Sequence, residues 1–310
     1  MEFRHVSVLL DECIRALNIR PDGIYVDGTL GGGGHSYEIA RRLTTGCLVG
    51  IDRDPVALKA AGDRLAPFGD RVRLVHGNFS EMDTILEDLG LPGADGILLD
   101  LGVSSPQLDD GARGFSYMTD APLDMRMDSG AALSAYEVVN TWPREELRRI
   151  LYEYGEERYA PQISAAIERR REKAPIETTL ELVEVIRSAM PPQALREKQH
   201  PAKRSFQAIR IAVNDELGAV SRVMETAVPL LNPGGRLAVI TFHSLEDRIV
   251  KNAMQRQAQG CTCPPEFPVC VCGKKPKVRV LTRKPIVSGP EELEENPRAR
   301  SAKLRVCEKL

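Results

Sequence analysis

The sequence Asp27-Gly-Thr-Leu-Gly-Gly-Gly-Gly-His-Ser36 sets the fold class of this 310-residue chain. It follows a short apolar run over residues 24–27 and leads into a helical pattern over residues 35–43. Glycines let the backbone approach a ligand closely, and the N-terminus of a helix offers free N–H groups. A glycine-rich turn between a strand and a helix therefore predicts a ligand site at the carboxyl end of a strand in an α/β sheet.

Strand and helix patterns alternate outward from this turn. The predicted strands cover residues 24–27, 47–52, 72–76, 96–100, 236–242, 278–281 and 303–307. The predicted helices that accompany them cover residues 35–43, 55–65, 82–89 and 244–257. This alternation is typical of an α/β fold with a mostly parallel sheet and helices on both faces.

The alternation stops between residues 107 and 204. This region has a loop rich in glycine and aspartate, then helical patterns, and no convincing buried strand. We predict an all-helical inserted domain at residues 107–204, within an α/β domain formed by residues 1–106 and 205–310. After the insertion we expect one long amphipathic helix over residues 205–231, followed by a turn at Asn232-Pro-Gly-Gly235.

The composition excludes several classes of protein. Hydrophobic residues make up 42% of the chain, which is enough for a core and argues against wholesale disorder. No run approaches the ~18 apolar residues of a membrane span, and the first residues do not resemble a signal peptide. We therefore expect a cytoplasmic protein with no membrane partner.

Charge is unevenly distributed, although the whole chain carries a formal charge of only −2. Residues 1–100 hold 16 acidic against 10 basic residues, and residues 243–310 hold 8 acidic against 14 basic residues. A further basic segment covers residues 196–210. Such segments suit a polyanion such as RNA, while charge alone favours an ordinary solvated surface.

Acidic residues end the strands that surround the glycine-rich turn. Asp52 ends the second predicted strand, 25 residues after Asp27, where a carboxylate can accept hydrogen bonds from ribose hydroxyls. Phe79 follows the third strand, where an aromatic ring can stack on adenine, and Asp100 ends the fourth. This pattern favours a cofactor that contains adenosine, with a purely structural glycine turn as the alternative.

Two common nucleotide motifs do not fit the turn. The dinucleotide fingerprint needs glycine where Ser36 or Tyr37 stands, and the chain has no P-loop motif. S-adenosylmethionine remains as the expected cofactor, because it has no pyrophosphate and its turn is less constrained.

Longer strings resemble the bacterial 16S ribosomal RNA cytosine-N4 methyltransferases, and the resemblance runs from about residue 5 to residue 305. These strings are Asp27-Gly-Thr-Leu-Gly-Gly-Gly-Gly-His-Ser36, Ile97-Leu-Leu-Asp-Leu-Gly-Val-Ser-Ser-Pro-Gln-Leu-Asp-Asp110, Arg113-Gly-Phe-Ser116, Pro122-Leu-Asp-Met-Arg-Met-Asp128, Tyr154-Gly-Glu-Glu-Arg158, Lys203-Arg-Ser-Phe-Gln-Ala-Ile-Arg210, Val213-Asn-Asp-Glu-Leu217, Thr241-Phe-His-Ser-Leu-Glu-Asp-Arg248 and Asn296-Pro-Arg-Ala-Arg-Ser301.

The resemblance implies a Rossmann-like class I methyltransferase whose helical insertion helps to hold the substrate. It implies methylation at N4 of a decoding-centre cytidine in 16S rRNA of the small ribosomal subunit, with S-adenosylmethionine as the methyl donor. The cofactor contacts that it implies are Gly33, Gly34, His35, Asp52, Phe79, Asp100 and Gln107.

The chemistry of cytosine suggests a role for Asp100. The exocyclic amine is a poor nucleophile because its lone pair is delocalised into the ring. A carboxylate that accepts a hydrogen bond from this amine would stabilise the charge that develops on N4. Asp100 is therefore a catalytic candidate, and a contact to the methionine part of the cofactor is the competing role.

Further residues are candidates for contact with RNA. A flipped-out base would lie near His243, beyond the fifth predicted strand, and Asn214 could read the edge of cytosine. A structural hydrogen bond is the alternative for both side chains. The candidates for phosphate contact are Lys203, Arg204, Arg210, Arg298 and Arg300.

Four of the seven cysteines are clustered, at Cys261, Cys263, Cys270 and Cys272. Four thiols within twelve residues can form a tetrahedral zinc site, although C-x-C is a less usual spacing than C-x-x-C. Free cysteines in a surface loop are the alternative, and the sequence leaves both open. No metal is expected in the active site.

Two other functions remain to be weighed. A DNA amino-methyltransferase would carry a Pro-Pro-aromatic loop after its fourth strand, and none follows Asp100. A silent ribosome-assembly factor would have no need of acids at successive strand ends. We therefore expect 16S rRNA as the partner and no DNA.

Overall fold

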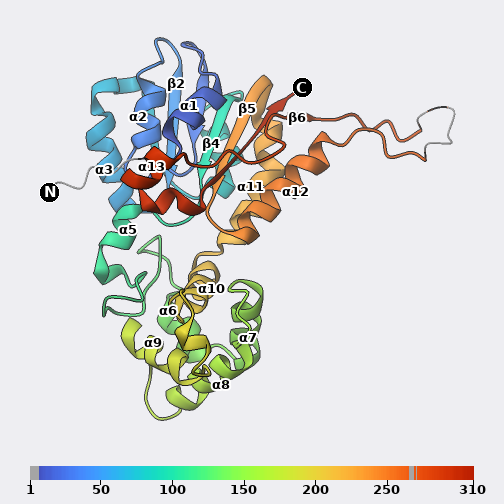
Figure 1. Cartoon of the computed structure of the whole chain (residues 1–310). Helices are drawn as coiled ribbons and strands as arrows, with labels where there is room; N and C mark the ends of the chain where they lie inside the picture. Colours follow the sequence, from blue (N-terminus) through green and yellow to red (C-terminus); the bar gives the residue numbers. More distant parts are fainter. Residues whose placement is uncertain (1–6, 265–268, 270) are drawn as a thin grey trace. The chain divides into compact units, whose positions relative to one another are not determined.

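The computed structural model describes residues 7–264, 269 and 271–310 (Figure 1). The chain divides into two compact units. The first unit combines Met1–Gly102 with Leu217–Leu310, and the second is Val103–Glu216. The predicted insertion, residues 107–204, is thus shorter than the second unit at both ends.

The first unit is built on a seven-stranded sheet with the strand order β3-β2-β1-β4-β5-β7-β6. β1 to β5 are parallel to their neighbours, whereas β7 is antiparallel to β5 and to β6. The predicted α/β class with a mostly parallel sheet is confirmed. The strands are β1 (Ile24–Asp27), β2 (Cys47–Asp52), β3 (Val72–His76), β4 (Ala94–Asp100), β5 (Leu231–Thr241), β6 (Val278–Val280) and β7 (Lys303–Lys309).

Helices cover both faces of this sheet (Figure 1). Successive residues of β4 point to opposite faces, so Leu98 packs in one core with Cys13 and Ile39, while its neighbours on β4 pack in the other. None of the described helices is both long and apolar enough to cross a membrane. The helices are α1 (Leu10–Leu17), α2 (Gly34–Ala40), α3 (Pro55–Leu65), α4 (Met82–Asp88), α11 (Glu216–Leu230), α12 (Ser244–Ala258) and α13 (Pro290–Glu295).

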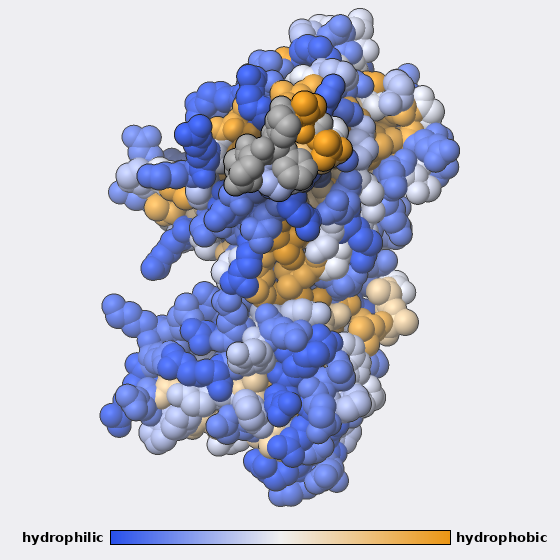
Figure 2. All heavy atoms as spheres, turned by 90° about the vertical axis from the view of Figure 1, so that its right-hand side faces the viewer, coloured by the Kyte–Doolittle hydropathy of each residue, from blue (hydrophilic) through white to orange (hydrophobic). Residues whose placement is uncertain are grey.

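The second unit is helical and has its own core. Val138, Leu147, Ile163 and Ile209 are each fully buried in that core. The face of this unit seen in Figure 2 is mostly hydrophilic, as expected for helices with one apolar side. The helices are α5 (Ser105–Asp109), α6 (Ala135–Thr141), α7 (Arg144–Glu153), α8 (Ala160–Arg171), α9 (Thr179–Ser188) and α10 (Lys203–Asn214).

The prediction of one long helix over residues 205–231 is wrong. The segment forms two helices, α10 and α11, because Asp215 between them adopts a left-handed conformation with φ 47°. Aspartate tolerates this conformation better than most residues that carry a Cβ atom. α10 packs with α6 and α7, and the helical unit therefore extends to Glu216.

The predicted turn at residues 232–235 lies within β5 and forms an irregularity of that strand. Ala94 pairs with Leu231 and Gly96 pairs with Arg236, so one residue of β4 faces residues 232–235 of β5, three more than regular pairing requires. Gly234 takes up the bend with φ 78°. The register of β5 is restored beyond this bulge, and Asp100 then pairs with Ile240.

Two helices of the first unit fall where the sequence predicts none. α1 precedes the first strand, and α13 lies between the last two strands. α13 begins with Pro290 and carries Glu291 and Glu292 in its first turn, a composition that suits a helix N-terminus. The Glu292 side chain also accepts the backbone N–H of Leu9 at 2.6 Å, so α13 is tied to the start of α1.

Removal of the buried Leu98 side chain should destabilise the first unit. Leu98 has no exposed surface, and Leu98→Ala should lower the free energy of unfolding by about 2–5 kcal/mol because it leaves a cavity. The control is Val56→Ala in α3, where the side chain is 61% exposed and the change should stay within about 0.5 kcal/mol. Urea unfolding measures both, and equal midpoints for the two variants would contradict this account of the core.

Candidate active site

The glycine-rich turn joins β1 to α2 and is held against the end of β2. Gly33 precedes α2 with φ 72°, a conformation that favours glycine, and a Cβ atom there would lie 3.2 Å from the Cβ of Ala61. The N–H of Gly31 donates to Oδ2 of Asp52 at 2.7 Å. Gly34 is the first residue of α2, so this part of the turn is the helix N-terminus that the sequence predicts.

Asp52 shapes this turn with both of its carboxylate oxygens. Its Oδ1 accepts the N–H of Asp54 at 2.9 Å, while Oδ2 accepts the N–H of Gly31. Burial raises the pKa of Asp52 above its ordinary value, and the two N–H donors act in the opposite direction. Each carboxylate oxygen can accept more than one hydrogen bond, so Asp52 retains the capacity to accept a hydroxyl.

Asp27 lies fully buried under the turn. Its oxygens accept the Ser36 hydroxyl at 2.7 Å and the N–H of Thr29 at 3.1 Å. Burial raises the pKa of Asp27, and these hydrogen bonds lower it in part. Asp27 therefore connects the end of β1 to the first turn of α2.

Asp100 ends β4 beside this turn, and its backbone N–H donates to the hydroxyl of Thr29 at 2.6 Å. Among the described residues, the buried Oδ1 of Asp100 has no hydrogen-bond partner. Burial, together with the charges of Asp27 and Glu246, raises the pKa of Asp100 to about 8. A buried carboxyl group of this kind favours a positively charged ligand, because a cation offsets the cost of its charged form.

His35 lies on α2 and faces Asp100. Its Nε2 is 3.0 Å from the carbonyl oxygen of Val8, and its Nδ1 is 3.9 Å from Oδ2 of Asp100. Only 6% of His35 is exposed. The contact to Val8 orients the ring, so the first turn of α2 forms one side of the site around Asp100.

Beyond β5, His243 caps α12 and is held by Glu246. Nε2 of His243 lies 3.1 Å from Oε1 of Glu246. Oε2 of Glu246 accepts the backbone N–H groups of Phe242 at 2.9 Å and His243 at 3.3 Å. Glu246, which is 1% exposed, is a site residue that the sequence analysis missed. Its signal was a glutamate at the third helical position, where it can reach back to the residue before the helix.

The two other predicted cofactor residues are Phe79 and Gln107, and a Cβ atom on Gly28 of the glycine-rich turn would lie 3.0 Å from the Cβ of Phe79. Phe79 begins a short 3-10 turn after β3, where it is partly buried and packs on one core of the sheet. Gln107 is buried in α5 and its Oε1 accepts the N–H of Ser104 at 3.0 Å. Gln107 belongs to the helical unit, so the predicted cofactor residues are divided between the two units.

The residues predicted to contact phosphate differ in solvent exposure and in whether they pair inside the protein. Lys203, Arg298 and Arg300 are exposed, and Arg204 is partly buried. Arg210 is different, because its guanidinium donates to both carboxylate oxygens of Glu216, at 2.8 and 2.9 Å. This bidentate pair engages Nε and Nη2 and offsets the charge of the guanidinium, so Arg210 is less available to a phosphate than the exposed basic residues are.

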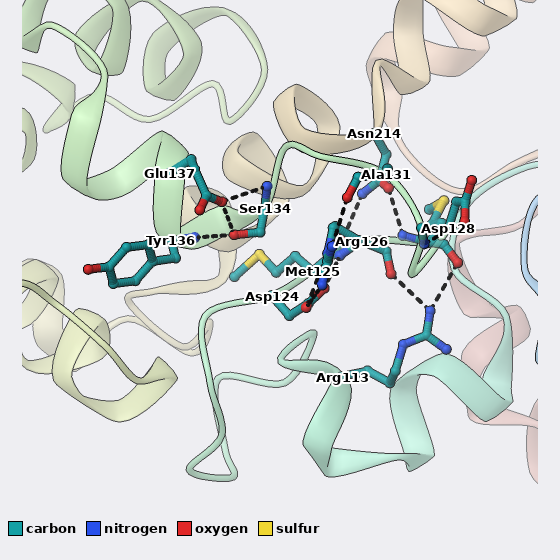
Figure 3. A network of polar contacts seen from close by, with 12 residues as sticks. Arg113, Asp124, Met125, Arg126, Asp128, Ala131, Ser134, Tyr136, Glu137 and Asn214 are labelled. Atoms are coloured by element: carbon teal, nitrogen blue, oxygen red, sulfur yellow. Dashed lines mark hydrogen bonds and ion pairs between the residues drawn. The ribbon is translucent and has the colours of Figure 1, made fainter.

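Asn214 has an internal role in the helical unit (Figure 3). Its Nδ2 donates to the carbonyl oxygens of Met125 at 2.7 Å and Arg210 at 2.9 Å, and its Oδ1 accepts the N–H of Met127 at 2.8 Å. Asn214 is only 6% exposed. These bonds occupy both amide hydrogens, so in this arrangement the side chain has no donor left to read a cytosine.

The loop that Asn214 binds belongs to the string at residues 122–128, and its charged groups also bind within the unit (Figure 3). Arg113 donates to the carbonyl oxygens of Arg126 at 2.9 Å and Met127 at 3.0 Å. Arg126 pairs with Asp124 at 2.6 Å and donates to the carbonyl oxygen of Ala131 at 2.7 Å. The string stands out in the sequence, but the sequence does not show that its polar groups hydrogen-bond within the loop and stabilise its conformation.

Comparison with known proteins places this arrangement in a family. The family model described as the MraW methylase family matches residues 2–310. The chain belongs to the MraW methylase family. Its Brevibacillus brevis relative, named ribosomal RNA small subunit methyltransferase H, is 59% identical over 100% of this chain and 99% of its own length. A Symbiobacterium thermophilum relative of the same name is 58% identical over 100% of this chain and 98% of its own.

A solved structure described as an rRNA methylase from Streptococcus thermophilus covers 97% of this chain and 93% of its own, at 12% identity and a TM-score of 0.43. The family assignment rests on the sequence comparisons, which span nearly the whole chain. As a member of this family, the protein is a methyltransferase that uses S-adenosylmethionine, and the predicted class and cofactor are confirmed.

The residues around the turn fit this cofactor. S-adenosylmethionine carries a sulfonium and an ammonium group, and the buried Oδ1 of Asp100 lacks a partner for such a charge among the described residues. Asp52 can accept hydrogen bonds from a ribose, and the turn at Gly33 and Gly34 allows a close approach of the backbone. We assign the cofactor to this edge of the sheet as a proposal, with Gly33, Gly34, Asp52 and Asp100 as its principal contacts.

The raised pKa of Asp100 predicts a pH dependence of stability in the protein without cofactor. The unfolded chain loses this proton near pH 4, whereas the folded chain keeps it until about pH 8. The stability that Asp100 contributes is therefore lost progressively as pH rises from about 4 to about 8. Asp100→Asn should flatten this decline, measured by urea unfolding at pH 5 and pH 8.

The exposed Asp63→Asn in α3 is the control, and it should keep the wild-type decline between the same two pH values. An identical pH dependence in wild type and Asp100→Asn would show that Asp100 titrates as an ordinary exposed carboxyl group.

Replacement of Asn214 should destabilise the helical unit. Asn214→Ala leaves the buried polar groups of the loop without their partners, at about 1–3 kcal/mol for each unsatisfied group. We expect the free energy of unfolding to fall by about 2 kcal/mol or more, while the exposed Gln193→Ala control stays within about 0.5 kcal/mol. Wild-type stability combined with a lower kcat/KM would instead support a direct contact of Asn214 with substrate.

Proposed function

We propose that this methyltransferase modifies N4 of a cytidine in the decoding centre of 16S rRNA, within the small ribosomal subunit. The observation that carries the proposal is similarity across the whole chain to relatives named ribosomal RNA small subunit methyltransferase H, at 58–59% identity. The choice of N4 of cytosine rests on the strings that resemble the cytosine-N4 methyltransferases. Action on ribosomal RNA implies that the protein works in the cytoplasm.

The row of acids at the sheet edge supports a methyl transfer from a bound sulfonium. When bound, S-adenosylmethionine supplies an electrophilic methyl group. Transfer of this methyl group to N4 of cytosine would leave S-adenosylhomocysteine, and the proton of N4 would pass to solvent. The protein has to place N4 about 3–3.5 Å from the methyl carbon and in line with the breaking bond.

Asp100 is the residue best placed to act in this step. Its Oδ1 can accept a hydrogen bond from the ammonium group of the cofactor or from the exocyclic amine of cytosine. We favour the contact to the cofactor, since a nearby cation lowers the raised pKa of a buried carboxyl group. The contact to the amine is the catalytic alternative, in which Asp100 stabilises charge on N4.

His243 is a positioning candidate for the target base. It lies two residues after the end of β5, whose residue Ile240 pairs with Asp100, so His243 is at the same end of the sheet. Oε1 of Glu246 lies 3.1 Å from Nε2 of its ring. A strong base is not required at this position, because N4 becomes acidic once it carries the methyl group.

RNA contact is proposed for the exposed basic residues. Lys203, Arg298 and Arg300 are exposed and can therefore reach phosphates, whereas the guanidinium of Arg210 is paired with Glu216. We propose that the helical unit, which contains Lys203 and Arg204, contributes to substrate recognition. Exposed charged residues of this unit are better candidates for RNA contact than Arg210 and Asn214, whose donors hydrogen-bond inside the unit.

Methyl transfer from isotopically labelled S-adenosylmethionine tests the function. Small ribosomal subunits that lack the modification, free 16S rRNA and duplex DNA are offered in parallel, and the labelled nucleoside is identified by mass. We expect N4-methylcytidine from the ribosomal substrates and no label in DNA. A lack of label in free rRNA would show that the folded subunit is part of what the enzyme recognises.

Two variants complete this experiment. Asp100→Ala should abolish turnover, while the exposed Asp63→Ala should keep wild-type activity. Turnover that survives Asp100→Ala with unchanged cofactor affinity would contradict any role of Asp100 in the reaction. Label in DNA would contradict the ribosomal substrate, and cofactor binding by calorimetry with no label in any substrate would do the same.

A further inference from the structure

Three thiols converge in the loop between α12 and β6. The Sγ atoms of Cys261, Cys263 and Cys272 lie within 4.8 Å of one another. The Sγ atoms of Cys261 and Cys272 are 3.7 Å apart, and both side chains are exposed. Cys270, the other cysteine of the cluster in the sequence, lies outside the described residues.

These distances match the geometry of a zinc–thiolate centre. A Zn–S bond is about 2.3 Å long, so two thiolates of a tetrahedral site lie about 3.8 Å apart. The pair Cys261 and Cys272 already has this separation, and small side-chain rotations bring Cys263 to the same distance. Soft thiolate ligands in tetrahedral geometry select zinc over magnesium or calcium.

We propose that Cys261, Cys263 and Cys272 supply three thiolate ligands to a structural Zn²⁺ ion, with one further ligand completing the tetrahedron. The proposed zinc site lies in the loop that leads from α12 into β6, which is the edge strand of the sheet. The acids of the active site follow β1, β2 and β4. The metal therefore acts on the loop and takes no part in methyl transfer.

The two limbs of the loop run side by side where the structure describes them (Figure 1). The N–H of Lys277 donates to the carbonyl oxygen of Gln257 at 2.8 Å, which closes the base of the loop. A Cβ atom on Gly260 would lie 3.4 Å from Cδ of Pro276, so the limbs stay in contact beyond the base. Cys261 and Cys272 come next on opposite limbs, and a shared metal ion would join them.

The sequence around the thiols is basic on one side. Lys274, Lys275 and Lys277 follow Cys272 in the sequence and add positive charge to the loop. Thiolates are the form that binds metal, and exposure leaves a path for the ion to enter.

Metal analysis of the full-length protein tests the proposal. Protein purified under reducing conditions without chelator should contain about one zinc per chain. The triple variant Cys261→Ser, Cys263→Ser, Cys272→Ser should contain almost none, because serine hydroxyls do not replace thiolates. The matched control Cys47→Ser changes a cysteine at the start of β2 and should keep its zinc.

Cobalt substitution gives a readout of the ligands themselves. Wild type and Cys47→Ser loaded with Co²⁺ should show thiolate-to-cobalt charge-transfer bands and the intense visible bands of a tetrahedral site, and the triple variant should show neither. Circular dichroism verifies that the variant is folded. Should it fail to fold, zinc release from the wild type as a mercurial reagent titrates its thiols gives the same information.

Several outcomes would overturn the proposal. These are equal zinc in the triple variant and the wild type, iron in place of zinc, and failure to bind Zn²⁺ or Co²⁺ after reconstitution under reducing conditions. A disulfide between Cys261 and Cys272 in freshly purified protein, detected by alkylation and mass spectrometry, would also overturn it.

Discussion

The burial of several carboxyl groups at one edge of the sheet is the constraint on which the active site depends. β1, β2 and β4 are parallel, so Asp27, Asp52 and Asp100 gather at their carboxyl ends. Asp27 and the nearby Glu246 are buried, and Asp52 and Asp100 are partly buried. Buried charge is costly unless it is paired. N–H and hydroxyl donors of the glycine-rich turn and α2 satisfy Asp52 and Asp27, whereas Oδ1 of Asp100 has no partner among the described residues. An acceptor oxygen without a partner is suited to a cationic cofactor.

The helical unit shows a different use of polar residues. Arg113, Asp124, Arg126 and Asn214 bind one another or nearby backbone groups, and together they hold the loop over residues 122–128 in one conformation. Such a network makes a rigid surface, since every buried polar group needs its partner. Under the proposed function, contact with RNA would fall to exposed groups on that surface. The string at residues 122–128 would then have a structural role that supports substrate binding indirectly.

The loop after α12 has no apolar core to stabilise it, because its limbs extend away from the sheet with few apolar contacts. Val269 and Val271 are 70% and 73% exposed, so burial of side chains does not hold this part of the loop. Hydrogen bonds at Gln257 and Lys277 close only the base. The proposed thiolate site supplies a cross-link between the limbs, as metals do in other segments too small to form a core.

The sequence by itself determined the α/β class, most strand positions and the acids Asp52 and Asp100, because strand ends and glycine turns depend on local patterns. Only the tertiary structure decided which polar residues are used internally. Asn214 bonds to residues 87 and 89 positions away, and no local pattern encodes such partners. The break at Asp215 was hidden for a similar reason, since apolar periodicity continues from α10 into α11 while packing assigns the two helices to different cores. Local patterns thus place the acids at one edge of the sheet, and long-range packing decides which polar side chains bind inside the protein.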